Sequence, residues 1–86
     1  ANPAFVEIYA PKTENLSISM QAMSFGSMSV EDVIFDGKLV DRIALQPFAE
    51  NYTINVTAIN GINALVFVPS SGNQLLGARN ITIKVE

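Results

Sequence analysis

Acidic side chains are the residues best placed to do chemistry in this sequence, because four of them gather around one turn. Glu31, Asp32, Asp36 and Asp41 lie within eleven residues of one another. Clustered carboxylate oxygens suit a hard cation such as calcium, and two neighbouring carboxyl groups can act as an acid and a base. However, their spacing matches no calcium-loop motif, and strand alternation would separate them onto two faces. We therefore expect solvated hairpin positions, with no metal and no cofactor.

The side chains that most enzymes use as a nucleophile or general base are missing. The sequence contains no cysteine and no histidine, which excludes disulfides, thiolate zinc sites, cysteine nucleophiles and the usual general base. Met20, Met23 and Met28 therefore have no partners for a soft-metal site, and we expect them to pack in a core. Ser70 and Ser71 have no base to activate a hydroxyl group. We predict that the protein is not an enzyme and has no catalytic residues.

Four N-x-[ST] sequons form the most specific motif in the chain. With eight asparagines and eleven serines and threonines in 86 residues, chance would give about one such motif. The sequons start at Asn15, Asn51, Asn55 and Asn80. They predict exposed positions that accept N-linked glycans on an extracellular protein. A strand with a polar outer face alternates asparagine and threonine and creates the same motif without any glycan, so both interpretations stay open.

Composition favours one small soluble domain. The chain has 86 residues, of which 49% are hydrophobic and 15% charged, enough apolar material for a core. Its net charge of −3 comes without a basic stripe, so we expect no nucleic-acid partner. The longest apolar run, residues 64–68, stops at Pro69, far short of the roughly 20 residues of a membrane-spanning helix. We expect a single domain over residues 1–86 and no membrane span.

Apolar and polar residues alternate along most of the chain, which is the pattern of β-strands. We expect strands over 4–10, 16–22, 30–35, 38–45, 51–59, 62–68 and 80–86. Asp36-Gly37 predicts a two-residue hairpin turn, and Asn60-Gly61 predicts a second. About seven short strands indicate an all-β fold, an immunoglobulin-like antiparallel sandwich, with a small barrel as the alternative. The residues predicted to share its core are Ile18, Ile54, Val56, Val66, Ile81 and Ile83.

A resemblance to a family rests on the run 30–35, the segment Asp36-Gly37-Lys38-Leu39-Val40, Pro47 and the strand 51–58. This arrangement resembles the β-rich globular heads of archaeal surface-filament proteins, the pilins and archaellins. It covers residues 16–86 as a pattern, one that immunoglobulin-like modules of bacterial surface proteins share. The resemblance implies an extracellular or cell-surface location and a homopolymer, with glycans as further partners. Pilins of the type IV class also carry a long N-terminal hydrophobic helix, which this sequence does not contain.

The segment 4–10 offers a different route to assembly. It alternates cleanly and is separated from the remainder by Pro11-Lys12-Thr13-Glu14, so residues 1–10 are a candidate donor strand for the open sheet of a neighbouring subunit. In that hypothesis Ala4, Val6 and Ile8 form the subunit interface. In the alternative, the segment is the first strand of the chain's own sandwich.

These observations predict a non-enzymatic structural subunit of an extracellular filament or surface layer that assembles through β-strand contacts. One alternative is a monomeric binding or adhesion module of a larger surface protein or carbohydrate-active enzyme, in which exposed Tyr9 or Phe48 would bind polysaccharide. Another is a virion structural protein.

Overall fold

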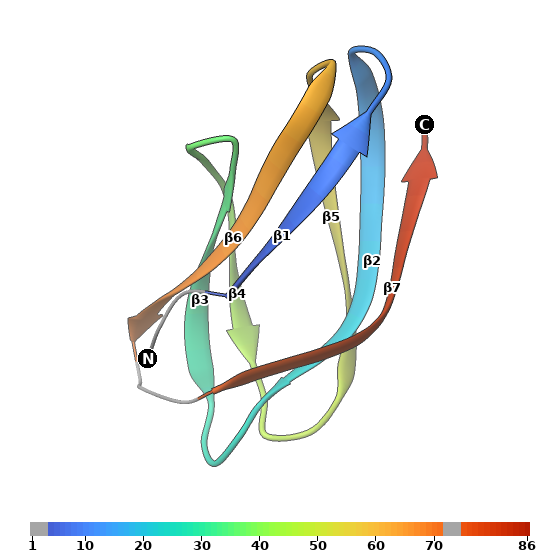
Figure 1. Cartoon of the computed structure of the whole chain (residues 1–86). Coiled ribbons are helices and arrows are strands. Elements are labelled where there is room, and N and C mark those ends of the chain that lie inside the picture. The colour runs from blue at the N-terminus through green and yellow to red at the C-terminus, as the bar shows by residue number, and fades with distance from the viewer. Residues whose placement is uncertain (1–3, 72–74) are drawn as a thin grey trace.

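Seven antiparallel strands in two sheets make up the structure, a computed structural model that describes residues 4–71 and 75–86 (Figure 1). A four-stranded sheet has the order β1-β6-β3-β4, and a three-stranded sheet has the order β5-β2-β7. The predicted all-β fold, an immunoglobulin-like antiparallel sandwich of about seven strands, is confirmed. No helix in the described part of the chain is long and apolar enough to cross a membrane. The strands are β1 (Ala4–Ala10), β2 (Glu14–Ser24), β3 (Ser29–Phe35), β4 (Lys38–Leu45), β5 (Glu50–Ala58), β6 (Gly61–Ser71) and β7 (Leu76–Val85).

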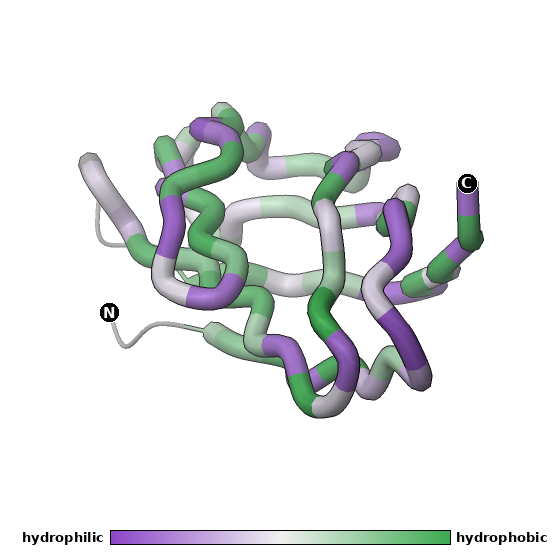
Figure 2. The backbone as a smooth tube through the Cα atoms, turned by 90° about the horizontal axis from the view of Figure 1, so that it is seen from above, coloured by the Kyte–Doolittle hydropathy of each residue, from purple (hydrophilic) through white to green (hydrophobic). Residues whose placement is uncertain are grey.

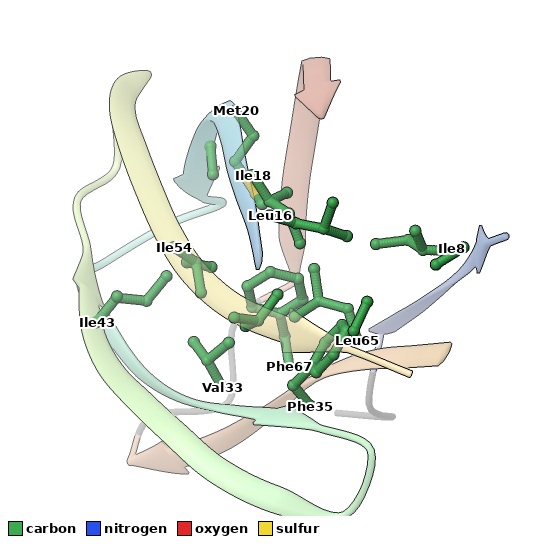
Figure 3. Close-up of a cluster of buried hydrophobic side chains, with 14 of the residues drawn as sticks. Ile8, Leu16, Ile18, Met20, Val33, Phe35, Ile43, Ile54, Leu65 and Phe67 are labelled. Carbon is green, nitrogen blue, oxygen red and sulfur yellow. The ribbon is translucent and has the colours of Figure 1, made fainter. Parts of the chain in front are cut away.

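The core lies between the two sheets and is built from every second residue of each strand. Hydrophobic and hydrophilic residues alternate along the backbone (Figure 2), as a strand with one dry face requires. In β2 this alternation buries Leu16, Ile18, Met20 and Ala22. They belong to one buried cluster with residues of the four-stranded sheet such as Val33 and Leu65 (Figure 3). Burying each large aliphatic side chain contributes about 1.5–3 kcal/mol, so this cluster is the main source of stability.

Half of the predicted core is confirmed and half is wrong. Ile18, Ile54 and Val56 are buried. Val66 is only half buried, because β6 turns Leu65 and Phe67 inward and the predicted face of that strand is therefore reversed.

Ile81 and Ile83 of β7 are 45% and 44% exposed, against the core prediction. Ile83 does share a face with buried Ile18, its direct partner across the β2–β7 pair. However, β7 is an edge strand of the three-stranded sheet. The pairing shifts register between Ser19 and Gln21, and Asn80 has a φ of 54°. The inward side of β7 therefore lies at an edge of the sandwich, where Ile81 lines a small hollow beside Val6 and Ile18.

The Asp36-Gly37 hairpin is confirmed. β3 and β4 pair from Phe35 and Lys38 outward, and φ is positive at both turn residues, 50° at Asp36 and 81° at Gly37. This is the two-residue turn that Asp-Gly favours. Asp36 also ties the turn to β6, since its Oδ1 accepts a hydrogen bond from the Ala64 backbone N–H at 2.8 Å.

The Asn60-Gly61 hairpin prediction is wrong, because β5 and β6 belong to different sheets. The chain turns a corner between the sheets, and buried Asn63 holds that corner. Its Oδ1 accepts from the Ile59 N–H at 2.9 Å. Its Nδ2 donates to the carbonyl oxygens of Ile59, Gly61 and Ile8 at 3.0–3.2 Å. One side chain thus replaces the ladder bonds that a hairpin would have made.

Strand β1 pairs with β6 of its own chain, from Ala4 opposite Phe67 to Ala10 opposite Gly61. Ile8 is buried, and Ala4 and Val6 pack against the same core from partly exposed positions. This is the arrangement of a first strand in its own sandwich. An exchange of this strand between copies, with Ala4, Val6 and Ile8 at a subunit interface, stays a prediction.

Candidate functional site

The four clustered carboxylates do not converge on one site. Asp32 binds Arg42 through Oδ1 and Nε at 2.6 Å, and Oδ1 of Asp41 accepts the Arg42 backbone N–H at 2.8 Å. Glu31 is not a solvated hairpin residue, since it is 2% exposed and accepts a hydrogen bond from the Ser29 hydroxyl at 2.8 Å. Within residues 4–71 and 75–86, no three His, Cys, Asp or Glu side chains gather as metal ligands would.

A hollow of about 270 Å³ lies on the outer face of the three-stranded sheet, where β2 ends. Met23 faces outward there, because Ala22 and Ser24 on either side of it are buried. Gly77 of β7 is its direct partner, so a side chain at that position would point outward too. We call this cavity the Phe25 hollow, after the ring that forms its wall. Its lining residues are Gln21, Ala22, Met23, Phe25, Ala49, Gly77, Ala78 and Arg79.

The Phe25 ring is held in place by close contact with backbone. A Cβ atom on Gly77 would lie 2.8 Å from Cε2 and Cζ of Phe25, so the ring occupies the space that the glycine leaves. The Phe25 N–H donates to the Leu75 carbonyl at 2.9 Å, which fixes the backbone beneath it. Although its edge is packed, the residue is 51% exposed. The hollow therefore has a positioned aromatic surface open to solvent.

Polar groups lie beside this ring in a fixed arrangement. Gln21 and Arg79 are direct partners in the β2–β7 pair. Oε1 of Gln21 accepts from Arg79 Nε at 3.0 Å and from Asn80 Nδ2 at 3.1 Å. In the described part of the chain, Nε is the only nitrogen of this guanidinium group with a hydrogen bond. Its remaining N–H groups are available to a ligand.

Asn51, Asn55 and Asn80 are exposed, as predicted, and so is Asn15; all four lie in the three-stranded sheet. Asn51 is opposite Gln21, and Asn55 is opposite Ser17. Asn15 accepts the Thr57 hydroxyl through Oδ1 at 2.9 Å. Asn80 lies next to the Phe25 hollow through its bond to Gln21. Glycosylation of these asparagines stays a prediction.

A second, larger hollow of about 700 Å³ opens at the other end of the sandwich, near the Asp36-Gly37 turn. Asn15, Asn55 and Thr57 contribute amides and a hydroxyl group, and Ile59 contributes exposed apolar surface. Phe35 also lines this hollow but is buried in the core. Asp36, Lys38 and Glu86 add charged groups of both signs to its lining. This second hollow therefore offers polar, charged and aliphatic contacts, without an exposed ring.

The phenol of Tyr52 has a pKa raised above its usual value, and its role is structural. Burial and the negative charge of Glu50 raise the pKa of its phenol, while a hydrogen bond at the Gln46 backbone acts in the opposite direction. The phenol donates to the Ala44 carbonyl at 3.0 Å, which links β5 to β4 between the two sheets.

Tyr9 and Phe48 are exposed, as expected for sugar-stacking rings, but neither lines the Phe25 hollow. Tyr9 lies on the four-stranded sheet opposite Ile62. Sequence reasoning missed Phe25, which lies in the break after the second predicted strand. The only signal was an aromatic residue within a Ser-Phe-Gly-Ser turn, and nothing in the sequence related it to Gly77.

Comparisons with known proteins give the fold but no family. No family model and no curated protein matches the sequence. The solved structure of CBM35 from Paenibacillus barcinonensis superimposes with a TM-score of 0.66 at 18% identity, covering 95% of this chain and 70% of that chain. The EclA C-terminal domain, a sugar-binding protein, superimposes with a TM-score of 0.68 at 12% identity, covering 98% of this chain and 79% of that chain. The chain therefore shares the β-sandwich fold of these two proteins, neither of which is an archaeal filament protein.

Proposed function

We propose that this protein is a non-catalytic sugar-binding module and that the Phe25 hollow is its binding site. The observation that carries the proposal is the exposed Phe25 ring, positioned on Gly77 beside the Arg79–Gln21 pair. The two structural neighbours support it, since one is a CBM35 and the other a sugar-binding protein. This is the binding-module alternative from the sequence, with a different aromatic residue at the site. An extracellular or secreted location follows from the proposal.

The chemistry of the hollow suits a sugar ring. A pyranose has C–H groups on its faces and hydroxyl groups around its edge. The C–H face can stack on the exposed ring of Phe25, as apolar groups pack on aromatic surfaces. The planar groups of Arg79 and Gln21 can bond the hydroxyl groups at the edge. Because the ring and the Gln21 amide are already positioned, little side-chain entropy is lost on binding.

The size of the hollow predicts weak binding of a single unit. Its volume of about 270 Å³ is slightly below the range of ligand pockets, which span about 300–1,000 Å³. We expect a dissociation constant near 1 mM for one or two sugar units, equivalent to about −4 kcal/mol.

The positions of the carboxylates favour a sugar-binding role over hydrolysis of a glycosidic bond. Glycoside hydrolysis uses two carboxyl groups on either side of the scissile bond, and no described Asp or Glu lines the Phe25 hollow. The filament-subunit hypothesis gains no support from β1, which pairs within its own chain.

The test is binding to a panel of soluble polysaccharides, by affinity electrophoresis and calorimetry, for wild type, Phe25→Ala and Phe5→Ala. Phe5 is the matched control, because it is 65% exposed and lies outside the Phe25 hollow. We expect Phe25→Ala to weaken binding about tenfold or more, the equivalent of 1.4 kcal/mol, and Phe5→Ala to bind as wild type does. A panel without any binder, or equal losses in both variants, would contradict the proposal.

A further inference from the structure

We infer that the ligand is an uncharged, linear polysaccharide whose chain lies along β2, from the Phe25 hollow to the second hollow. The inference rests on the proposed function and specifies its ligand: the interior of a neutral polymer, as opposed to a chain end or an acidic sugar. It rests on the outer face of the three-stranded sheet.

Four rows of side chains cross this outer face, one for each outward residue of β2 from Asn15 to Gln21. Strand β2 lies between β5 and β7, so its outward residues run along the middle of the face (Figure 1). From Gln21 to Asn15 the rows extend over six residues, or about 20 Å of strand. The rows, in the order β5, β2 and β7, are Asn51–Gln21–Arg79, Thr53–Ser19–Thr82, Asn55–Ser17–Lys84 and Thr57–Asn15.

The charge on this face matches a neutral ligand. All eight outward positions of β2 and β5 in these rows are Asn, Gln, Ser or Thr. In the whole chain 15% of the residues are charged, and these eight positions carry none of that charge. Arg79 and Lys84 supply the charges of these rows, and both are on the edge strand β7. Amides and hydroxyl groups both donate and accept hydrogen bonds, which complements the hydroxyl groups of an uncharged sugar chain.

Cross-strand hydrogen bonds hold these side chains in place. Ser19 Oγ and Thr53 Oγ1 are 3.1 Å apart, and Thr57 Oγ1 donates to Asn15 Oδ1 at 2.9 Å. Each of these groups has further hydrogen-bonding capacity for a ligand. A face of fixed donors and acceptors loses less entropy on binding than one of free lysine and glutamate side chains.

The two hollows lie at opposite ends of these rows. Gln21, in the first row, lines the Phe25 hollow. Asn15, Asn55 and Thr57, in the last two rows, line the second hollow. The face is thus continuous with the proposed site and connects it to the larger cavity. A chain end would use the Phe25 hollow alone, whereas an extended chain uses every row.

The experiment is calorimetry with a length series of neutral oligosaccharides from a polymer that the wild type binds, using bacterially produced protein without glycans. We expect affinity to rise with length until the oligosaccharide spans about 20 Å, then to level off. Asn55→Ala should weaken binding of the long oligosaccharides about fivefold and leave the disaccharide unchanged. Asn60→Ala is the matched control, because Asn60 is exposed but outside the rows, and it should bind as wild type does.

The outcomes separate this inference from the proposed function. Affinity that does not change with length, or an Asn55→Ala variant that binds long oligosaccharides normally, overturns the extended-chain inference. The proposed function still stands in that case if Phe25→Ala loses binding. A preference for acidic sugars, with affinity that falls as salt rises, overturns the neutral ligand class. Absence of binding at every length contradicts the inference and the proposed function together.

Discussion

Phe25 and Gly77 are 52 residues apart in the sequence but pack directly against each other. The edge of the Phe25 ring occupies the space that a side chain at position 77 would fill. A Cβ at Gly77 would come within 2.8 Å of the ring atoms Cε2 and Cζ. The aromatic wall of the Phe25 hollow therefore depends on a glycine in another strand.

Gly77→Ala should remove sugar binding without unfolding the protein. The added methyl group displaces the Phe25 ring, which is half exposed and can move outward into solvent. We expect binding to fall about as far as in Phe25→Ala, with a stability loss below about 1 kcal/mol. Gly37→Ala is the control for stability, since Gly37 has a φ of 81° and open space around it. That variant should lose about 1 kcal/mol and bind normally. Wild-type binding by Gly77→Ala would show that the ring position is not needed.

Ile54→Ala should cost much more stability than Ile83→Ala. Ile54 is buried between the sheets, so its truncation leaves a cavity and costs about 2–5 kcal/mol. Ile83 is on the inward side of β7 but partly exposed, so it has less apolar contact to lose. Denaturant unfolding of both variants measures the difference. Equal losses would mean that β7 packs more closely on the core than the structure shows.

Asn63→Ala should be among the most destabilising polar substitutions in the chain. It leaves the Ile59 N–H and three carbonyl groups at the corner without their partner. Each buried group left unsatisfied costs about 1–3 kcal/mol. Asn60→Ala changes the same residue type at an exposed neighbour and should be close to neutral. Thermal unfolding compares the two, and similar melting temperatures would reject the role of Asn63.

An N-linked glycan on the outer face of the three-stranded sheet should interfere with sugar binding there. The sequence predicts that at least one of Asn51, Asn55 and Asn80 is modified in the native source. Since Asn51 is opposite Gln21 and Asn80 bonds it, a glycan at either position would cover the Phe25 hollow. We expect glycosylated protein to bind polysaccharide less well than enzymatically deglycosylated protein. An intact mass of native protein equal to the bare polypeptide would reject the glycosylation prediction.

Local sequence patterns predicted the strands well, because a period of two and a turn pair such as Asp36-Gly37 are encoded by neighbouring residues. They failed where the outcome depends on distant strands. The Asn60-Gly61 corner follows from the bonds of Asn63 to both sides of the turn, including the carbonyl of Ile8. The exposure of Ile81 follows from its place on the edge strand β7, beside the register shift of the β2–β7 pair, which periodicity does not specify.

The candidate site was less predictable than the fold for the same reason. The polar character of the outer face was visible in the alternating Asn and Thr of β5, and the predicted exposure of Asn51, Asn55 and Asn80 is confirmed. The Phe25 hollow was not, because it combines the end of β2 with the start of β7. Two of the clustered carboxylates have partners elsewhere: Asp32 pairs with Arg42, and Glu31 accepts a hydrogen bond from Ser29. Their closeness in sequence did not bring them to one site.

Mapping of backbone amide chemical shifts by NMR, during titration with a neutral oligosaccharide, tests the central claim most directly. The account predicts that the largest shifts occur at Gln21, Phe25, Gly77 and Arg79, with smaller shifts at Ser17 and Ser19 as longer oligosaccharides are added. Shifts confined to the four-stranded sheet around Tyr9, or no shifts with any sugar of the panel, would contradict it.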